Sequence, residues 1–197
     1  VPFNPDYNGA TQEGMCKTQT TIRNGKRASA AAGYLKPAMS RPNLRVEAEV
    51  LVERVLLEGK RAVGVEYSQG GQRQQAKARA EVILCAGSIK SPQILELSGI
   101  GQGQRLKDLG IEVKHDLWGV GENLRDHVAP RMKWQVTQQQ ATYNGKVNGL
   151  GLGWQALRYA FNRQGFLGMP SAPMLAFMRT REELESPDIQ LHLVPFR

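Results

Sequence analysis

The sequence predicts a mixed α+β / α/β fold in which a turn of small residues joins an apolar strand to a helix. Three observations predict it. An apolar run over residues 82–85 is followed by small residues and then by a helical pattern. Residues 44–84 contain short segments rich in Val and Leu, separated by Gly turns, as is typical of an antiparallel meander. Residues 131–197 combine one amphipathic helical pattern with strand patterns, which indicates a second antiparallel sheet.

The first forty residues predict loops followed by a helix. Residues 1–30 are rich in Asn, Gly, Thr and Gln, and their turn signals leave room for one short strand over residues 17–22. A helix is expected from Ser29, whose hydroxyl can cap it, to about residue 39. Pro37 lies inside this pattern and should bend or shorten the helix, because proline has no N–H to donate.

The meander follows from the alternation of apolar strands with Gly-containing turns. Turns are expected at residues 58–60 and 69–72, where Gly59, Gly70 and Gly71 occur. Short strands are expected on both sides of these turns, over residues 44–46, 50–57, 62–67 and 74–80. The simplest role of such a ribbon is structural, as the cover of a larger sheet.

The turn after the meander is the element around which the chain is organised. The run over residues 82–85 predicts a buried strand, which would make Cys85 a buried, reduced thiol. Ser88 can cap the next helix, expected over residues 92–97 and stopped by Gly99.

Ala86 and Gly87 leave little bulk at this turn. Backbone N–H groups at a helix N-terminus attract anions, and a flat cofactor edge can approach closely where side chains are small. An ordinary strand–turn–helix corner would have the same local pattern, so local physics leaves both interpretations open.

The remaining elements predict the start of a second domain. A helix is expected to end at Gly110, and a tight loop is expected over residues 119–121. The second half of residues 147–161 predicts an amphipathic helix, and strands are expected over residues 111–113, 132–136, 174–178 and 189–194. His127 follows Asp126 without a Ser or Cys nucleophile in a recognisable elbow, and His192 is a lone strand histidine, so neither indicates catalysis.

Composition excludes several classes of function. The net charge is +8, but the basic residues are spread out and are not interleaved with aromatic residues, so no nucleic-acid partner is expected. No apolar run reaches the ~20 residues that span a bilayer. Two distant cysteines do not suggest a disulfide framework, which fits a reducing cytoplasm. No metal-ligand pattern is expected.

A family resemblance rests on a set of short motifs that extends along nearly the whole chain. The central motif occupies fifteen positions and consists of Gly87-Ser88, Ser91-Pro92, Ile94-Leu95 and Ser98-Gly99-Ile100-Gly101. It resembles the second signature of the glucose-methanol-choline (GMC) flavoprotein oxidoreductases. The other motifs are similar to those of the choline and alcohol dehydrogenase branch: Asp6-Tyr7-Asn8-Gly9, Gln12-Glu13-Gly14, residues 25–29, Tyr34-Leu35, residues 41–44 and residues 119–127.

The resemblance implies a domain organisation and a set of site residues. Residues 1–130 would form the middle part of an FAD-binding, Rossmann-like domain, with the meander at 44–84 and the signature turn at 85–101. Residues 131–197 would begin the substrate-binding domain. The cofactor-binding residues implied are Val52, whose backbone would contact the adenine, and Ala86, Gly87 and Ser91 at the turn; the substrate pocket implied includes Pro173 and Met174.

The resemblance also shows what is missing from this sequence. The family holds the FAD pyrophosphate on a Gly-x-Gly-x-x-Gly loop after a strand, whereas Gly99, Gly101 and Gly103 follow a helix. The family's catalytic His motif does not occur either. We therefore expect an internal segment with no catalytic residue of its own and weak or absent FAD binding. The alternative is a non-catalytic, truncated module that acts through protein–protein contacts, with self-association of the chain.

The implied activity of the parent protein is oxidation of a primary alcohol by hydride transfer to flavin. Choline dehydrogenases carry a Glu just before a Gly-Gly-Phe-x-Arg segment, and here the position matching that Glu falls at about Pro173. A permanent cation needs a carboxylate or an aromatic cage, and the neighbouring Met174 supplies neither. We therefore expect an uncharged alcohol as substrate, with choline as the alternative.

Overall fold

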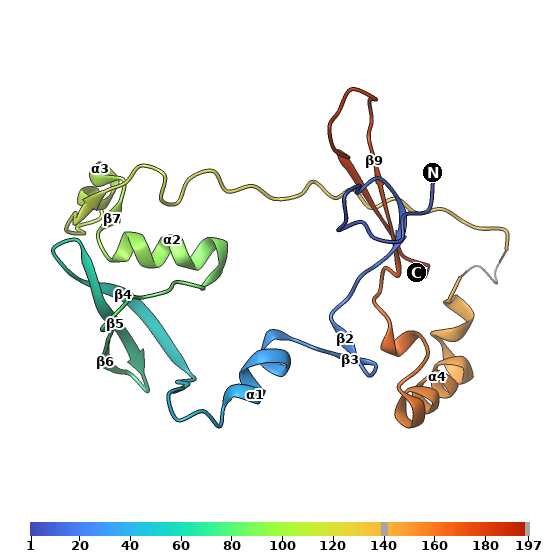
Figure 1. Cartoon of the computed structure of the whole chain (residues 1–197), viewed down its shortest axis with the longest axis horizontal. Helices are drawn as coiled ribbons and strands as arrows, with labels where there is room; N and C mark the ends of the chain where they lie inside the picture. Colours follow the sequence, from blue (N-terminus) through green and yellow to red (C-terminus); the bar gives the residue numbers. More distant parts are fainter. Residues whose placement is uncertain (139–141, 196–197) are drawn as a thin grey trace. The chain divides into compact units, whose positions relative to one another are not determined.

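The structure is a computed structural model that describes residues 1–138 and 142–195 (Figure 1). The chain forms two compact units. We call Arg45–Arg131 the meander unit, and Val1–Leu44 together with Met132–Arg197 the terminal unit. The predicted boundary between cofactor and substrate domains, at residues 130 and 131, concerns the whole enzyme and stays a prediction.

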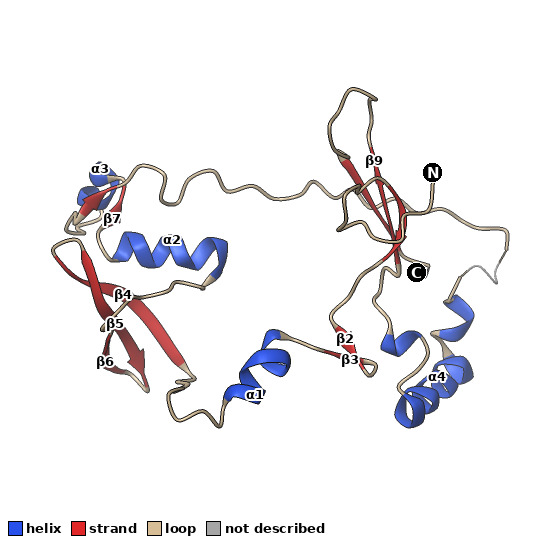
Figure 2. Cartoon of the chain, in the orientation of Figure 1, coloured by secondary structure: helices blue, strands red, loops and turns tan. Residues whose placement is uncertain are grey.

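The meander unit contains the predicted three-stranded ribbon. Strands β4 (Val50–Glu58), β5 (Arg61–Gln69) and β6 (Gln72–Lys77) pair antiparallel in the order β4-β5-β6 (Figure 2). The register between β4 and β5 shifts between Val52 and Arg54, so that Glu53 forms a bulge. The strand expected over residues 44–46 does not form, because no described strand pairs with it.

Helix α2 (Gly87–Leu97) packs against β4, the edge strand of this sheet. The Ser98 hydroxyl, directly after the helix, accepts the Val55 N–H at 2.8 Å. Gly99 then adopts a φ of +84°, which ends the helix as predicted.

A small parallel pair of strands follows the helix. Strand β7 (Ile100–Gly101) pairs with β8 (His115–Asp116), and α3 (Gly103–Asp108) connects them. Leu106 of α3 is fully buried. Gly110, at a φ of +73°, ends this segment as predicted, but the strand expected over residues 111–113 forms slightly later, at β8.

The prediction of a buried strand over residues 82–85 is wrong for this structure. These residues run as a loop between β6 and α2 (Figure 2). A strand is stable only when a neighbour satisfies its backbone groups, and none of the described strands pairs with this run. Ile83 is 71% exposed as a result, and Cys85 is an exposed free thiol rather than a buried one.

The terminal unit is built on a second antiparallel sheet, in the order β1-β9-β10. Its strands are β1 (Gly14–Lys17), β9 (Met174–Met178) and β10 (Ile189–Leu193). The two later strands confirm the prediction. The early strand lies at residues 14–17 instead of 17–22, and its pairing with β9 was not predicted from the sequence.

One face of this sheet forms a small core. Cys16, Leu175 and Phe177 are buried on it, and the Tyr7 ring stacks on Phe177 with the ring centroids 5.3 Å apart. This core joins the start of the chain to a strand about 160 residues later.

The helix expected from Ser29 forms in two pieces. A π-helical turn, η1 (Ala31–Leu35), leads into the short α1 (Lys36–Ala38). The Ser29 hydroxyl accepts the Ala32 N–H at 3.3 Å, which supports the predicted cap. The change between the two pieces falls between Leu35 and Lys36, and Pro37, which has no N–H to donate, lies in the first turn of α1.

The rest of the terminal unit surrounds one longer helix. The hairpin of β2 (Ile22–Arg23) and β3 (Lys26–Arg27) turns at Asn24-Gly25, where both residues have positive φ. Helix α4 (Gly149–Asn162) confirms the predicted amphipathic helix, and the turns η3 (Asn144–Lys146) and η4 (Phe166–Gly168) flank it. The strand expected over residues 132–136 is wrong, because no described strand pairs with that segment. None of the helices within residues 1–138 and 142–195 is long and apolar enough to cross a bilayer.

Candidate functional site

An open groove of about 680 Å³ lies between strand β4 and helix α2 of the meander unit. Apolar and charged residues line it, and both elements contribute to each kind. The lining residues are Val50, Leu51, Val52, Glu53, Arg54, Glu66, Arg73, Ala86, Lys90, Gln93, Ile94 and Leu97.

The structure places two of the predicted cofactor residues together at this groove. Val52 reaches it from the edge strand and Ala86 from the N-terminal end of α2, although they are 34 positions apart in the sequence. Gly87 and Ser91 lie in the first turns of the same helix. The meander and the turn, which were predicted separately, therefore both line one groove.

The N-terminal end of α2 differs from its predicted form. Ser88 does not cap the helix, whose N-cap residue is Ala86. Instead, the Ser91 hydroxyl accepts the Ala86 N–H at 3.1 Å. Gly87 adopts a φ of +86°, and a side chain built there would meet no other atom within 4 Å. The turn is thus held by one side-chain hydrogen bond, and the space beside Gly87 is open.

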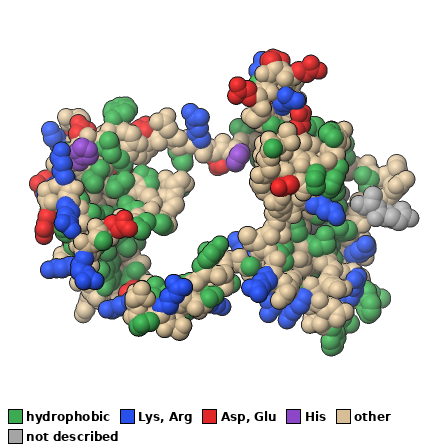
Figure 3. Space-filling view, in the orientation of Figure 1, with side chains coloured by type: hydrophobic (Ala, Val, Ile, Leu, Met, Phe, Trp, Pro, Cys, Tyr) green, Lys and Arg blue, Asp and Glu red, His purple; other side chains and the backbone are tan. Residues whose placement is uncertain are grey.

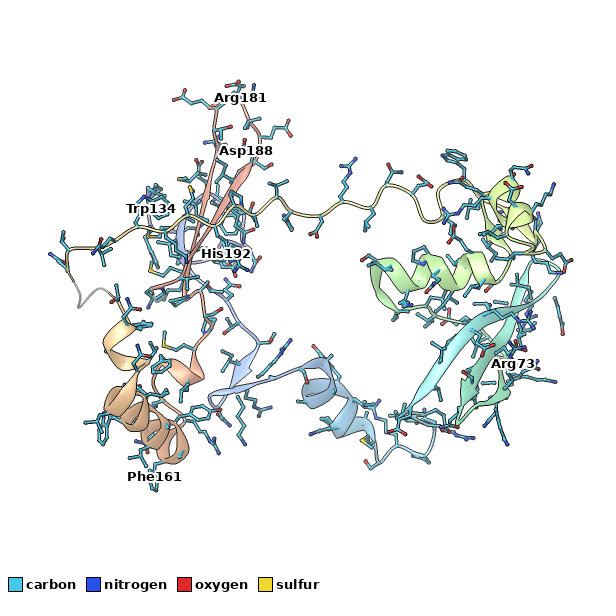
Figure 4. The ribbon with its side chains drawn as sticks, turned by 180° about the vertical axis from the view of Figure 1, so that it is seen from behind. Arg73, Trp134, Phe161, Arg181, Asp188 and His192 are labelled. Carbon is cyan, nitrogen blue, oxygen red and sulfur yellow. The ribbon has the colours of Figure 1, made fainter. Side chains whose placement is uncertain are left out.

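Four of the charged residues that line the groove form two ion pairs. Arg54 contacts both carboxylate oxygens of Glu66, at 3.0 and 3.2 Å, and Glu66 is only 8% exposed. The hydrogen bond from Arg54 is the largest of the effects that hold the pKa of Glu66 below its ordinary value, against the opposing effect of burial. Arg73, labelled in Figure 4, pairs with Glu53 at 3.0 Å.

Sequence reasoning missed these four charged residues. The register could have indicated one pair, because Arg54 and Glu66 lie directly opposite each other in the predicted hairpin. The bulge at Glu53, which sequence periodicity does not show, turns the second pair toward the groove.

The chemistry of the groove suits a flat, uncharged ring with polar edges. Its walls are largely apolar. Four of its charged residues neutralise one another in pairs, and Lys90, bonded to Gln93, adds one positive charge. β4 is an edge strand, so one of its two sides has no neighbouring strand in its sheet. The Val55 N–H bonds Ser98, and the neighbouring backbone groups on the unpaired side remain available to a ligand.

The predicted substrate residues belong to the terminal unit. The Pro173 carbonyl accepts the Thr18 N–H at 3.0 Å. Met174 is half-buried and pairs in register with Lys17 on one side and Leu193 on the other. Paired residues of neighbouring strands point to the same face, so Met174 shares its face with an ammonium group and an aliphatic chain.

The remaining candidate residues form no reactive cluster. His127 and His192 are both exposed. Asp188, labelled in Figure 4, accepts hydrogen bonds from the Thr180 N–H and hydroxyl, and these bonds lower its pKa. Among the residues that the structure describes, no three His, Cys, Asp or Glu side chains are grouped so as to hold a metal ion.

Comparison with known proteins gives a consistent result. The family profile described as GMC oxidoreductase matches residues 1–129. The oxygen-dependent choline dehydrogenase of Photobacterium profundum is 42% identical over 194 residues, which cover 98% of this chain and 34% of that protein. The mitochondrial choline dehydrogenase of Homo sapiens is 44% identical over 198 residues, which cover 98% of this chain and 32% of that protein. The chain thus spans about a third of the length of these relatives.

Solved structures show the same similarity in three dimensions. An FAD-dependent oxidoreductase from Chaetomium thermophilum matches with a TM-score of 0.78 at 28% identity, over 90% of this chain and 32% of that one. A formate oxidase matches with a TM-score of 0.82 over 98% of this chain and 37% of that one; at 23% identity, this likeness shows the fold alone.

Proposed function

This chain belongs to the GMC oxidoreductase family, and from that premise we propose that it serves as a segment of an FAD-dependent enzyme that oxidises a primary alcohol. The resemblance to the choline and alcohol dehydrogenase branch is confirmed, and so is the mixed fold of an FAD-binding oxidoreductase. The activity, cofactor and substrate proposed below are those of a parent protein about three times as long as this chain.

The observation that supports the proposal is the meeting of Val52 and Ala86 at one groove. The residues present fit an FAD adenine edge: an apolar groove, a free strand edge and a glycine with open space in front of it. The Val52 backbone, Ala86, Gly87 and Ser91 would hold this part of the cofactor. FAD, when bound, supplies the acceptor for the hydride of the alcohol.

The experiment compares flavin retention in two variants of the full-length parent. Gly87→Val fills the open approach at α2 and should abolish flavin absorbance in the purified protein. Lys77→Ala, at an exposed end of β6, should leave it unchanged. Equal flavin content in the two variants would contradict the assignment of the groove.

We further propose that the chain alone binds FAD weakly or not at all. The alternative is a non-catalytic module that acts through protein contacts. An absorbance scan of the isolated chain separates the two: bound flavin supports residual cofactor binding, whereas a colourless oligomer supports the module.

For the substrate, we favour an uncharged alcohol over choline. Met174 has Lys17 and Leu193 as its register partners, so a quaternary ammonium would meet like charge and would lack a carboxylate. Choline is the second candidate, because the relatives that match this chain are named choline dehydrogenases. A cytoplasmic location is also part of the proposal, since both cysteines are free thiols.

A further inference from the structure

The segment that leads into strand β9 is held by one residue from the start of the chain, Thr18. The Thr18 N–H donates to the Pro173 carbonyl at 3.0 Å, and the Thr18 hydroxyl donates to the Ala172 carbonyl at 2.6 Å. Thr18 directly follows β1, whose last residue, Lys17, pairs with Met174. Thr18 therefore continues the contact between the two strands beyond the end of their regular pairing.

The sequence of this segment gives the two bonds particular weight. Pro170 and Pro173 have no N–H, so neither can donate a backbone hydrogen bond. In the described part of the chain, the hydrogen bonds that connect residues 170–173 to another element both start at Thr18. The bond from the hydroxyl is partly buried, so its loss would leave the Ala172 carbonyl without this donor where water only partly replaces it.

The opposite end of the same strand pair is held by charge. The Arg179 guanidinium contacts one carboxylate oxygen of Glu13 through Nε at 2.9 Å and through Nη2 at 2.7 Å. Its Nη1 donates to the carbonyls of Glu182 and Leu184 at 3.4 and 3.2 Å. Figure 3 shows acidic and basic side chains together at the β9–β10 loop, which begins at this end. An ion pair thus fixes one end of the pair, and Thr18 fixes the other.

Buried side chains between these two ends fix the middle of β9. Leu175 and Phe177 are 4% and 7% exposed, and both pack in the core that includes Cys16 of β1. Sliding β9 along β1 would expose this apolar surface, which is unfavourable. Pro173 lies just before the strand begins, so its place depends on the two bonds from Thr18.

We propose that Thr18 is a positioning residue of the alcohol pocket, which it supports by holding Pro173 and Met174 in place through the carbonyls of Ala172 and Pro173. The inference rests on the proposed function, in which these two residues line the substrate pocket. Thr18 acts through the residues that it holds and not on the reacting atoms. A wall that is fixed in this way favours an alcohol whose chain fills the space beside it, because each methylene buried against the wall adds to binding.

Steady-state kinetics on the full-length enzyme test the proposal, with hexanol and ethanol as substrates. Thr18→Val keeps a branched side chain of similar size but removes the hydroxyl that donates to Ala172. The ratio of kcat/KM for hexanol to kcat/KM for ethanol should fall at least about threefold. The KM for hexanol should rise, while kcat per bound flavin should change less than about twofold, since the lost bond contributes to binding and not to the chemical step.

Matched variants separate the hydroxyl from general effects on folding. Thr18→Ser keeps the donor and should retain the native ratio within about twofold. Thr20→Val makes the same substitution at an exposed threonine two residues further on, and it should leave the ratio unchanged. A variant that only reduced the fraction of folded enzyme would slow both alcohols equally and would not move the ratio. Thr18→Ala removes the same hydroxyl with less bulk and carries the same expectation, should Thr18→Val not fold.

The outcomes separate this inference from the proposed function. In an enzyme that oxidises both alcohols, an unchanged ratio in Thr18→Val would overturn the role of Thr18. So would an equal shift in Thr20→Val, or a ratio in Thr18→Ser as low as that in Thr18→Val. A full-length protein that binds flavin but oxidises neither alcohol would instead overturn the proposed function, and the inference with it.

Discussion

The hydroxyl of Ser98 joins helix α2 to Val55 on the edge of strand β4. It accepts the Val55 N–H at 2.8 Å and donates to the Ile94 carbonyl at 2.5 Å. Both Ser98 and Val55 are buried. This bond therefore connects strand β4 to the end of helix α2, the two elements that line the groove.

Replacing Ser98 by Ala should therefore destabilise the meander unit by about 1–3 kcal/mol, because the Val55 N–H would stay buried without an acceptor. Urea unfolding followed by circular dichroism measures the loss. Ser88→Ala, on the exposed first turn of the same helix, is the control and should change the free energy of unfolding by less than about 0.5 kcal/mol. Equal effects would mean that the bond does not couple helix to strand.

Two glycines with the same backbone conformation should respond differently to alanine. Gly87 and Gly99 have φ values of +86° and +84°, so a side chain is strained at both. Only at Gly99 would the added carbon also clash with backbone, namely the Glu112 carbonyl and the Lys114 nitrogen. Gly99→Ala should cost about 1–3 kcal/mol more than Gly87→Ala in urea unfolding. Similar costs would contradict the packing described here.

Acid should remove the contribution of Glu66 to stability. Its pKa is lower in the folded protein than in the unfolded one, chiefly because of the hydrogen bond from Arg54. Its stabilising effect is therefore complete above the unfolded pKa of about 4.3 and is lost as pH falls through the folded pKa.

The urea midpoint of Glu66→Gln should thus lie below that of the unmodified chain at pH 7, and the two should converge as the pH falls below the folded pKa of Glu66. Glu112→Gln, which removes an exposed pairing with Lys114, is the control and should change the midpoint little at either pH. A difference for Glu66→Gln that persists in acid would show that packing, not charge, is responsible.

The two cysteines should react at very different rates. Cys85 is exposed, whereas Cys16 is fully buried and its pKa is raised by burial, with a smaller opposing effect of its bond to the Leu175 carbonyl. An aromatic disulfide reagent should label one thiol quickly in the native chain and both in denaturant. Cys85→Ser should abolish the fast phase. Two fast thiols would show that the core around Cys16 opens readily.

Steady-state kinetics on the full-length protein should distinguish the two substrate candidates. We expect a higher kcat/KM for a medium-chain primary alcohol than for choline. Pro173→Glu, which places a carboxylate beside Met174, should shift the ratio toward choline by about tenfold or more, while Ser171→Glu should shift it less. A native preference for choline would mean that the pocket assignment at Pro173 and Met174 is wrong.

The sequence by itself determined the elements whose signals are local. The Gly turns at 59 and 70–71 and the Val-rich segments between them predict the meander, and the spacing of apolar residues predicts α4. The motif from Gly87 to Gly101 identifies the family, because its small and polar residues are constrained position by position.

Only the tertiary structure decided which predicted strands exist. Two segments, residues 82–85 and 132–136, have the composition of strands, but no described strand pairs with them. The segment Gly14–Lys17 was not predicted to be a strand over these bounds, and it forms one because β9 pairs with it. Backbone hydrogen bonds between strands join residues that are far apart in sequence, so the local periodicity of one segment cannot predict them. For the same reason the sequence could name Val52 and Ala86 but could not show that the two residues line the same groove.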